Sequence, residues 1–92
     1  MLSFEWDIEK AKGNERIHGI TFDEASTVFA DPLSLTINDP LHSEKEERFI
    51  LMGISHKNRM LIVVHTERGD NIRVISARRA TKKERLYYES NV

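Results

Sequence analysis

The chain has 92 residues, of which 39% are hydrophobic and none is cysteine, and it carries 14 Lys/Arg against 15 Asp/Glu. This composition predicts a single globular domain over residues 1–92 with one modest core, and it excludes disulfides and thiolate chemistry. No apolar run approaches the roughly 18 residues of a membrane span, and the acidic start does not resemble a signal peptide, so we expect a cytoplasmic protein without membrane contact.

Charge is distributed unevenly along the chain. Residues 1–47 hold eleven acids and four Lys/Arg, a balance of −7, whereas residues 48–92 hold four acids and ten Lys/Arg, a balance of +6. A basic second half favours a polyanionic partner, because each phosphate that a cation neutralises releases counterions. A solvated helix face gives the same count, so charge alone does not identify the partner.

The first elements are a short strand or leading segment at residues 4–6 and a helix over residues 8–17. Asp7 can cap this helix, because its carboxylate accepts otherwise unpaired backbone N–H groups. Gly13 weakens the helix by about 1 kcal/mol relative to alanine, so the helix depends on tertiary packing. His18-Gly19 ends it, since glycine readily adopts the left-handed conformation at a helix C-terminus.

Thr21–Glu24 has the pattern of a capping box and predicts a second helix over about residues 22–29. Its apolar residues recur at helical spacing and predict one buried face: Phe22, Ala25, Val28 and Phe29. Asp31-Pro32 ends this helix. Residues 33–37 are a candidate strand, and residues 39–47 are a polar loop or a helical turn.

Three strand-like runs follow, at about residues 48–55, 60–67 and 71–77, and His56–Arg59 connects the first two. Gly69-Asp70 is a two-residue loop of the kind that closes tight hairpins. It predicts three cross-strand pairs: Glu67 with Ile72, Thr66 with Arg73, and His65 with Val74. The middle strand is apolar on both faces, so we expect both of its sides to be covered, at least in part.

Thr81–Glu84 is a second capping box and opens a C-terminal helix that ends near Tyr88 or Glu89. Two helices therefore precede the main strands and one follows them. This order predicts an α+β fold, with a small antiparallel sheet of about four strands and helices to its side.

The motifs of several enzyme classes are absent. There is no Gly-rich phosphate loop, no nucleophile elbow and no H-E-x-x-H motif. The four histidines, which are His18, His42, His56 and His65, lack metal-ligand spacing. The sequence therefore predicts neither a metal nor a cofactor, and it leaves the chemistry of Arg, Lys, Glu and His.

RNA cleavage needs little more than these side chains. A base takes the proton of the 2′-hydroxyl, cations stabilise the extra negative charge on the phosphate, and an acid protonates the leaving oxygen. The segments 65–69 and 76–79, together with Arg73, supply a possible base and several guanidinium groups on adjoining strands. The planar fork of a guanidinium suits phosphate oxygens.

Structural roles compete with each of these functional roles. Glu67 and Arg68 can be charged residues at the rim of a turn. Arg78 and Arg79 can pair with acids of the first half, such as Asp39 or Glu46. His65 lies in an apolar strand and is favoured as a core residue. The remaining structural candidates are His18 as a helix C-cap, and Trp6, Tyr87 and Tyr88 as packing residues.

A set of residues in a particular order resembles a known family. The set comprises Phe4–Asp7, Lys10, Asn14, His18-Gly19, Phe22–Ala25, Phe29–Pro32, Glu47–Phe49, Gly53, Thr66–Gly69 and Ile72–Arg85. Together these residues resemble the BrnT-type toxins of bacterial type II toxin–antitoxin modules, over nearly the whole chain. The opening F-E-W-D with H-G and the closing I-S-A-R-R-A-T-K-K-E-R are the specific blocks.

The resemblance implies a RelE-like fold and a ribonuclease that arrests translation by cutting RNA without a metal. It also implies a BrnA-type antitoxin as a tight partner, whose DNA-binding domain lets the complex bind operator DNA and repress its own operon. By position, the candidate catalytic residues are His18, Glu67, Arg68, Arg78 and Arg79. One departure is Ile17, because the family usually has a lysine there, and Arg16 is the available substitute.

The leading hypothesis is an endoribonuclease toxin. Arg78 and Arg79 converge on the scissile phosphate in this hypothesis, and either Glu67 or His18 is the base. Flanking phosphates are assigned to Arg73, Lys82 and Lys83. A second hypothesis is a non-catalytic subunit that binds the antitoxin through its acidic half within an autoregulatory repressor complex. A third is a nucleic-acid-binding protein that acts alone, and the lack of an aromatic platform on the strands disfavours it.

Overall fold

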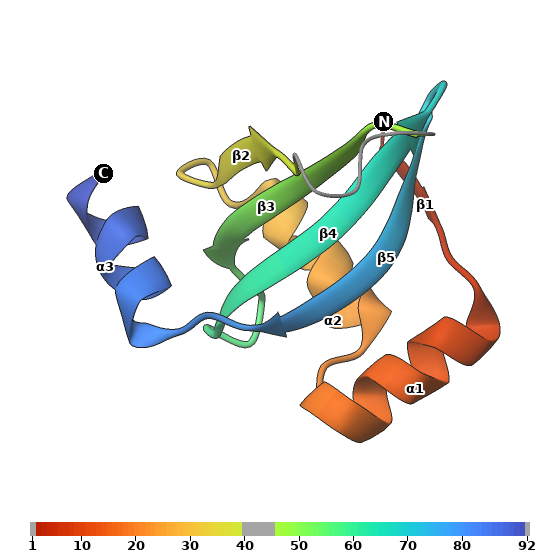
Figure 1. The fold of residues 1–92 in the computed structure, drawn as a ribbon, viewed down its shortest axis with the longest axis horizontal. Coiled ribbons are helices and arrows are strands. Elements are labelled where there is room, and N and C mark those ends of the chain that lie inside the picture. The colour runs from red at the N-terminus through yellow and green to blue at the C-terminus, as the bar shows by residue number, and fades with distance from the viewer. Residues whose placement is uncertain (1, 40–45, 92) are drawn as a thin grey trace.

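The computed structural model describes residues 2–39 and 46–91 (Figure 1). In chain order its elements are β1 (Ser3–Glu5), α1 (Ile8–His18), α2 (Phe22–Thr27), the 3₁₀ turn η1 (Val28–Ala30), β2 (Leu35–Asn38), β3 (Arg48–Ile54), β4 (Met60–Arg68), β5 (Asn71–Arg79) and α3 (Lys82–Ser90). The α+β class and the three helices are as predicted. The second helix is shorter than expected, because it tightens into η1 after Thr27. Most of the predicted loop at 39–47 lies at 40–45, outside the described residues.

The described strands form one five-stranded sheet in the order β1-β5-β4-β3-β2. The sheet is mixed, because β1 runs parallel to β5 while the other neighbouring strands are antiparallel. The prediction of about four antiparallel strands therefore needs correction. Residues 3–5 pair with residues 71–73, and no local pattern reveals a parallel pairing across so long a stretch of chain.

The β4–β5 hairpin has the register that its loop predicted: Glu67 pairs with Ile72, Thr66 with Arg73, and His65 with Val74. Gly69 has a φ of 61°, a left-handed conformation that glycine adopts without steric cost. Beyond His65 the register shifts, because Val64 pairs with Ser76 and one residue of β5 bulges out between them. Because of this bulge, each side chain in the second half of β5 lies on the opposite face of the sheet from the one that strict alternation from Val74 would give.

The helical caps follow the local sequence closely. The Asp7 carboxylate accepts hydrogen bonds from the backbone N–H groups of Glu9 and Lys10, which lowers the pKa of Asp7. Gly19 ends α1 with a φ of 70°. Thr81 and Glu84 form the complete capping box predicted for α3. At Thr21 only half of the box forms, because the Glu24 side chain turns into the protein instead.

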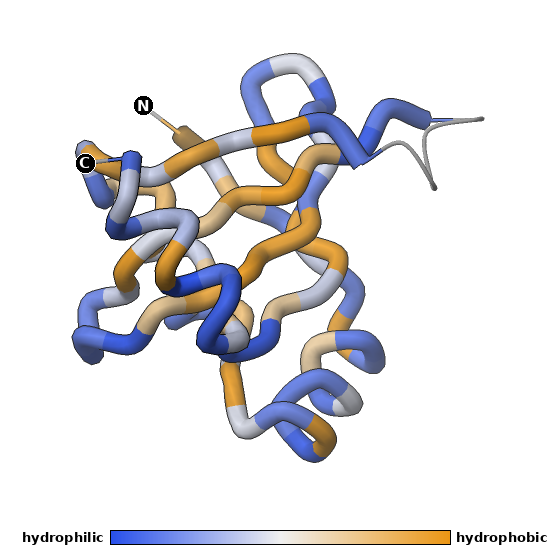
Figure 2. The backbone as a smooth tube through the Cα atoms, turned by 60° about the vertical axis from the view of Figure 1, so that its left-hand side comes forward, coloured by the Kyte–Doolittle hydropathy of each residue, from blue (hydrophilic) through white to orange (hydrophobic). Residues whose placement is uncertain are grey.

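The core lies between the sheet and α2 with η1; α2 crosses behind the strands in Figure 1, whereas α1 lies beside β5. Its buried members are Ile20, Phe22, Ala25, Val28, Leu51, Leu61, Val63, Val74 and Ala77. The predicted apolar face of the second helix is thereby confirmed, with Phe29 and Trp6 packed at its margin. Figure 2 shows the hydrophobic residues concentrated in the central strands, whereas α1 and α3 are mainly hydrophilic.

α3 stands beside the sheet rather than across it (Figure 1). Its buried residue Tyr88 donates a 2.8 Å hydrogen bond to the Asp31 carboxylate. Burial and this hydrogen bond raise the pKa of Tyr88 to about 12. Tyr88 is therefore a packing residue as predicted, whereas Tyr87 is exposed. No helix in the described part of the chain is both long and apolar enough to cross a bilayer.

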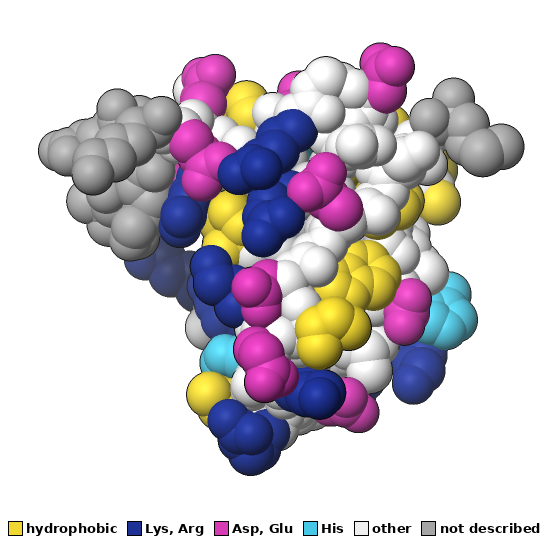
Figure 3. Space-filling view, turned by 90° about the vertical axis from the view of Figure 1, so that its right-hand side faces the viewer, with side chains coloured by type: hydrophobic (Ala, Val, Ile, Leu, Met, Phe, Trp, Pro, Cys, Tyr) yellow, Lys and Arg dark blue, Asp and Glu magenta, His cyan; other side chains and the backbone are white. Residues whose placement is uncertain are grey.

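Charges of both signs are interleaved on the folded surface. In Figure 3, Lys/Arg and Asp/Glu side chains alternate over the face that it shows, and neither sign covers a continuous area. Ion pairs join the two halves of the chain, for example Glu5 with Arg73 and Glu24 with Arg59. The acidic and basic halves of the sequence therefore do not become an acidic and a basic surface on this face.

Candidate functional site

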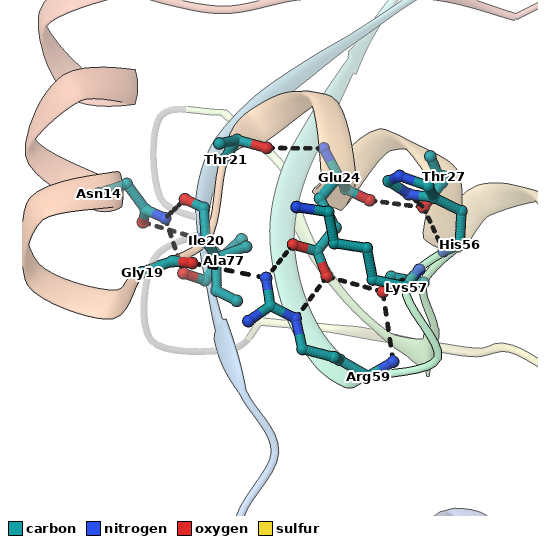
Figure 4. A network of polar contacts seen from close by, with 11 residues as sticks. Asn14, Gly19, Ile20, Thr21, Glu24, Thr27, His56, Lys57, Arg59 and Ala77 are labelled. Atoms are coloured by element: carbon teal, nitrogen blue, oxygen red, sulfur yellow. Dashed lines mark hydrogen bonds and ion pairs between the residues drawn. The ribbon is translucent and has the colours of Figure 1, made fainter.

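Asn14 joins α1 to β5 through its side-chain amide (Figure 4). The amide nitrogen donates to the carbonyl of Ala77 at 2.8 Å, and the amide oxygen accepts from the N–H of Ala77 at 3.0 Å. The same nitrogen donates to the carbonyl of Ile20 at 3.0 Å. Asn14 is the buried residue of α1, so this polar contact fixes where the helix lies on the strand.

The sheet topology explains why β5 needs this contact. β1 pairs with β5 only as far as Arg73, so the edge of β5 beyond that point has no neighbouring strand on that side. A backbone N–H and C=O left there without a partner would be costly, because they are buried. The Asn14 amide supplies one donor and one acceptor, as a neighbouring strand would.

A second set of contacts brings the end of α1 to the end of β5. Arg59 donates through Nη2 to the carbonyl of Gly19 at 3.5 Å, and the N–H of Ala80 donates to the carbonyl of Met60 at 3.0 Å. Arg59 and Met60 are consecutive residues, so the turn after α1 and the residue after β5 both attach to the same short stretch. His18 and Arg79 directly precede these two attachment points.

The β-bulge decides which of the two consecutive arginines faces α1. Arg79 pairs with Leu61, a member of the helix-facing core, whereas Arg78 pairs with Ile62. Because side chains alternate along a strand, Arg79 lies on the face of Ala77 and Arg78 lies on the opposite face. Without the bulge, side-chain alternation from Val74 would have placed Arg78 on the helix-facing side of the sheet and Arg79 on the opposite face.

We call this place the helix end of the sheet. Four exposed side chains belong to it: His18, Arg79, Lys82 and Lys83. No carboxylate within residues 2–39 and 46–91 forms an ion pair with Arg79. His18 ends α1 and is exposed, as a helix-terminal imidazole is expected to be. The lysines occupy the first turn of α3, three and four residues beyond Arg79. Together they present positive charge with an imidazole at its margin.

Arg78 has a different environment. Its two terminal nitrogens bind the two carboxylate oxygens of Glu84, each at 2.8 Å. This bidentate pair lowers the pKa of Glu84 to about 2 and raises the pKa of Arg78. The pairing with an acid was predicted, but Asp39 and Glu46 were the wrong partners. Arg78 and Arg79 therefore do not converge, because they lie on opposite faces of β5 and Arg78 holds α3.

The other predicted residues lie at the far end of the sheet, which we call the hairpin end: Glu67, Arg68 and Arg73. Arg68 contacts Glu46 at 3.4 Å and Arg73 contacts Glu5 at 2.9 Å. Glu67 lines an open hollow of about 460 Å³ beside the β4–β5 turn. Glu67 lies six positions along β4 from Leu61, the residue that pairs with Arg79, a distance of about 20 Å.

His65 is a core residue, as expected from its apolar strand. It is 2% exposed, and its ring packs between those of Phe29 and Phe49, with ring centroids 4.8 Å and 5.6 Å away. Burial lowers the pKa of His65, and its Nδ1 has no hydrogen-bond partner among the described residues. A neutral, enclosed imidazole of this kind stabilises the core rather than contacting a substrate.

Two polar groups that matter here had no role assigned from the sequence. One is Asn14, and its position within an otherwise weakly apolar helix was the available signal. The other is Glu24, whose carboxylate is 1% exposed and binds the Arg59 guanidinium and the Ser55 hydroxyl (Figure 4). The Arg59 contact lowers the pKa of Glu24. The capping-box pattern at Thr21 hid this second role for Glu24.

Within residues 2–39 and 46–91, no three or more His, Asp or Glu side chains are grouped so that they could hold a metal ion. The chemistry open to the helix end is that of its imidazole, guanidinium and ammonium groups.

Comparison with known proteins gives a family and a fold. Residues 6–84 match the family model described as the ribonuclease toxin, BrnT, of type II toxin–antitoxin systems. The crystal structure of the Brucella abortus ribonuclease toxin, BrnT, is similar with a TM-score of 0.65 and 20% sequence identity. The alignment covers 89% of this chain and 100% of the Brucella chain. No curated protein sequence matches the chain significantly.

Proposed function

The chain belongs to the BrnT family of ribonuclease toxins of type II toxin–antitoxin systems, and we propose that it is a metal-independent endoribonuclease that inhibits translation by cutting RNA at the helix end of its sheet. The observation that carries this proposal is the position of His18 and Arg79. Two separate sets of contacts hold the ends of α1 and β5 together, and both side chains are exposed there.

The proposed reaction is attack of the 2′-oxygen on the adjacent phosphorus. His18 takes the proton of the 2′-hydroxyl, and histidine suits this task because the side chain ordinarily titrates near neutral pH. The new bond joins the 2′-oxygen to phosphorus, and the bond from phosphorus to the 5′-oxygen breaks. The leaving 5′-oxygen takes a proton from solvent. The products are a 2′,3′-cyclic phosphate and a 5′-hydroxyl.

Arg79 stabilises the transition state in this proposal. Its guanidinium presents parallel N–H donors that match two phosphate oxygens, and negative charge accumulates on these oxygens during the attack. Within residues 2–39 and 46–91 no acid forms an ion pair with Arg79, so these donors are available to RNA in this proposal. Lys82 and Lys83 would then contact the phosphates that flank the cleaved bond.

The geometry favours His18 over Glu67 as the base. Glu67 lies about 20 Å from the partner of Arg79 along β4, too far to act on a phosphate that Arg79 holds. We assign Glu67, Arg68 and Arg73 to contacts with RNA beyond the cleaved bond. Arg78 is assigned to the attachment of α3, since Glu84 occupies its donors.

The family also implies a protein antitoxin as partner. We propose that this antitoxin is of the BrnA type, that it carries the contact with operator DNA, and that the complex acts in the cytoplasm. We retain the RelE-like classification of the fold as part of this proposal. Its support is the order of helices and strands around the sheet.

Incubation of the purified protein with RNA in EDTA tests the proposal. We expect fragments that end in 2′,3′-cyclic phosphate, and we expect Arg79→Ala to reduce their rate of formation strongly. Antitoxin binding serves as the control for folding of the variant. Intact RNA with the wild-type protein would overturn the catalytic proposal and favour the alternative of a non-catalytic subunit in a repressor complex.

A further inference from the structure

The side chain of Asn14 binds three backbone groups at once. It binds both backbone groups of Ala77 and also the carbonyl of Ile20, so one amide connects the middle of α1, the end of β5 and the turn that follows α1. Figure 4 shows the amide between the helix and the strand. These three segments are the ones that determine where His18 lies relative to Arg79.

The spacing along each element makes the connection specific. His18 lies four residues beyond Asn14, and therefore one turn further along nearly the same face of α1. Arg79 lies two residues beyond Ala77, on the same face of β5. α1 and β5 run in roughly the same direction in Figure 1, so both steps lead from the Asn14 contact toward the helix end.

We propose that Asn14 is a positioning residue, which acts by holding the His18 imidazole at the correct distance and angle from a phosphate bound by Arg79. This proposal rests on the proposed function and deepens it, because it names the group that aligns the base with the phosphate-binding residue. Asn14 itself does not touch RNA, since its amide is buried and fully engaged.

The weak apolar contact of α1 explains why one amide has so much influence. Asn14 is the buried residue of this helix, and of its apolar residues Ile8 and Ile17 are 63% and 72% exposed. Hydrophobic packing therefore restrains the rotation and sliding of α1 only weakly. A misplacement of the base by about 1 Å can cost about 100-fold in rate, because proton transfer requires close alignment.

A double-mutant cycle on RNA cleavage tests the proposal. The variants are Asn14→Ala, His18→Ala and the pair together, and rates are expressed per folded molecule. We expect Asn14→Ala to lower kcat/KM by about 100-fold in the wild-type background and by less than about threefold in the His18→Ala background. An equal loss in both backgrounds would overturn the proposal, because Asn14 would then act on stability or on RNA binding in general.

A matched control removes another buried hydrogen bond at the opposite end of the sheet. The hydroxyl of Thr66 is buried and donates to the carbonyl of Glu47 at 2.8 Å. Thr66→Val deletes this bond at nearly constant volume. In a double-mutant cycle with His18→Ala, we expect its effect on kcat/KM to be the same in the wild-type and the His18→Ala backgrounds. Asn14→Asp is the second test variant, because it keeps an acceptor for Ala77, removes the donated bonds and sets a carboxylate oxygen against the carbonyls of Ala77 and Ile20.

A second readout does not depend on catalysis. Inorganic phosphate is titrated into the protein while the NMR signals of the His18 imidazole are followed. We expect phosphate to shift these signals, and we expect Asn14→Ala or Asn14→Asp, but not Thr66→Val, to weaken the response by at least about tenfold. A phosphate response that depends on Asn14, in a protein that leaves RNA intact, would overturn the proposed function and support the positioning role. Normal RNA cleavage by a folded Asn14 variant would overturn the positioning role alone.

Discussion

The arginines at the two ends of the sheet differ in whether an acid of the protein pairs with them. At the hairpin end, Arg68 and Arg73 are engaged by Glu46 and Glu5, two acids from the first half of the chain. At the helix end, Arg79 has no acid partner within the described residues, and His18 is exposed at the end of α1, the helix that Asn14 joins to β5. Arginine content alone would make the two ends equivalent. The availability of the guanidinium for a new anion distinguishes them, and it depends on which acids the fold brings near.

From the comparison of the two ends we expect the largest change in the rate of RNA cleavage when Arg79 is removed. Arg79→Ala should lower the rate of RNA cleavage by about 10² to 10³, because one strong donor to the transition state is lost. Arg68→Ala is the matched change at the hairpin end, and it should lower the rate less than about fivefold. Single-turnover cleavage in EDTA measures both. A larger loss for Arg68→Ala would reverse the assignment of the two ends.

The base should give the next largest effect. His18→Gln should lower the rate by about 10², within the usual range for a general base, while RNA binding changes little. His56→Gln is the control, since His56 is also exposed but its side chain contacts Thr27 of α2. Equal activity of the two variants would exclude His18 as the base and return attention to Glu67.

The loss of unfolding free energy should be larger when a buried ion pair is broken than when a half-buried one is broken. Glu24→Gln should lower the free energy of unfolding by about 2 kcal/mol, because it leaves a buried network around Arg59 without its charge. Glu5→Gln, which breaks the half-buried pair with Arg73, should cost less than about 1 kcal/mol. Urea unfolding measures both, and cleavage per folded molecule should stay unchanged for Glu24→Gln.

The smallest effect concerns the attachment of α3. The folded pKa of Glu84 is about 2, below its ordinary 4.5, so its pair with Arg78 stabilises the protein fully above pH 4.5 and is lost as the pH falls toward 2. Glu84→Gln keeps a capping side chain and removes the charge. It should cost about 0.5–1 kcal/mol at pH 7, since both partners are partly exposed.

The pH dependence of this difference provides the check. The gap in unfolding free energy between wild type and Glu84→Gln should narrow between pH 5 and pH 2, as followed by urea unfolding at several pH values. A gap that is constant over this range would show that the Glu84 charge does not hold α3.

Local signals predicted the elements well and their assembly less well. Caps at Asp7 and Thr81 and the Gly69-Asp70 loop act through neighbouring residues, so their helices and hairpin register follow directly from the sequence. The pairing of β1 with β5 joins segments far apart in the chain, and no local pattern encodes it. Residues 4–6 were predicted as a short strand or a leading segment, but the place of this strand in the sheet, and hence the mixed sheet, was missed for that reason.

In the candidate site, too, the sequence indicated individual residues better than their arrangement in space. The family resemblance gave His18 and Arg79 as candidates, which stay predictions, and the leading hypothesis placed Arg78 beside Arg79 on one phosphate. A single bulge in β5 and the carboxylate of Glu84 separate the two, and neither consequence is visible without coordinates. The role of Asn14 was likewise hidden, because a polar residue in a helix usually faces solvent.

The most direct test of the account is to find which end of the sheet holds RNA. A short oligonucleotide with a 2′-deoxy group at the cleavage position cannot react, because it lacks the attacking 2′-oxygen. Its contacts with the protein can therefore be mapped by NMR. We predict that the backbone signals of His18, Gly19 and Arg79 shift most strongly as the oligonucleotide is added. Shifts confined to Glu67, Arg68 and their neighbours in the β4–β5 turn would contradict the account.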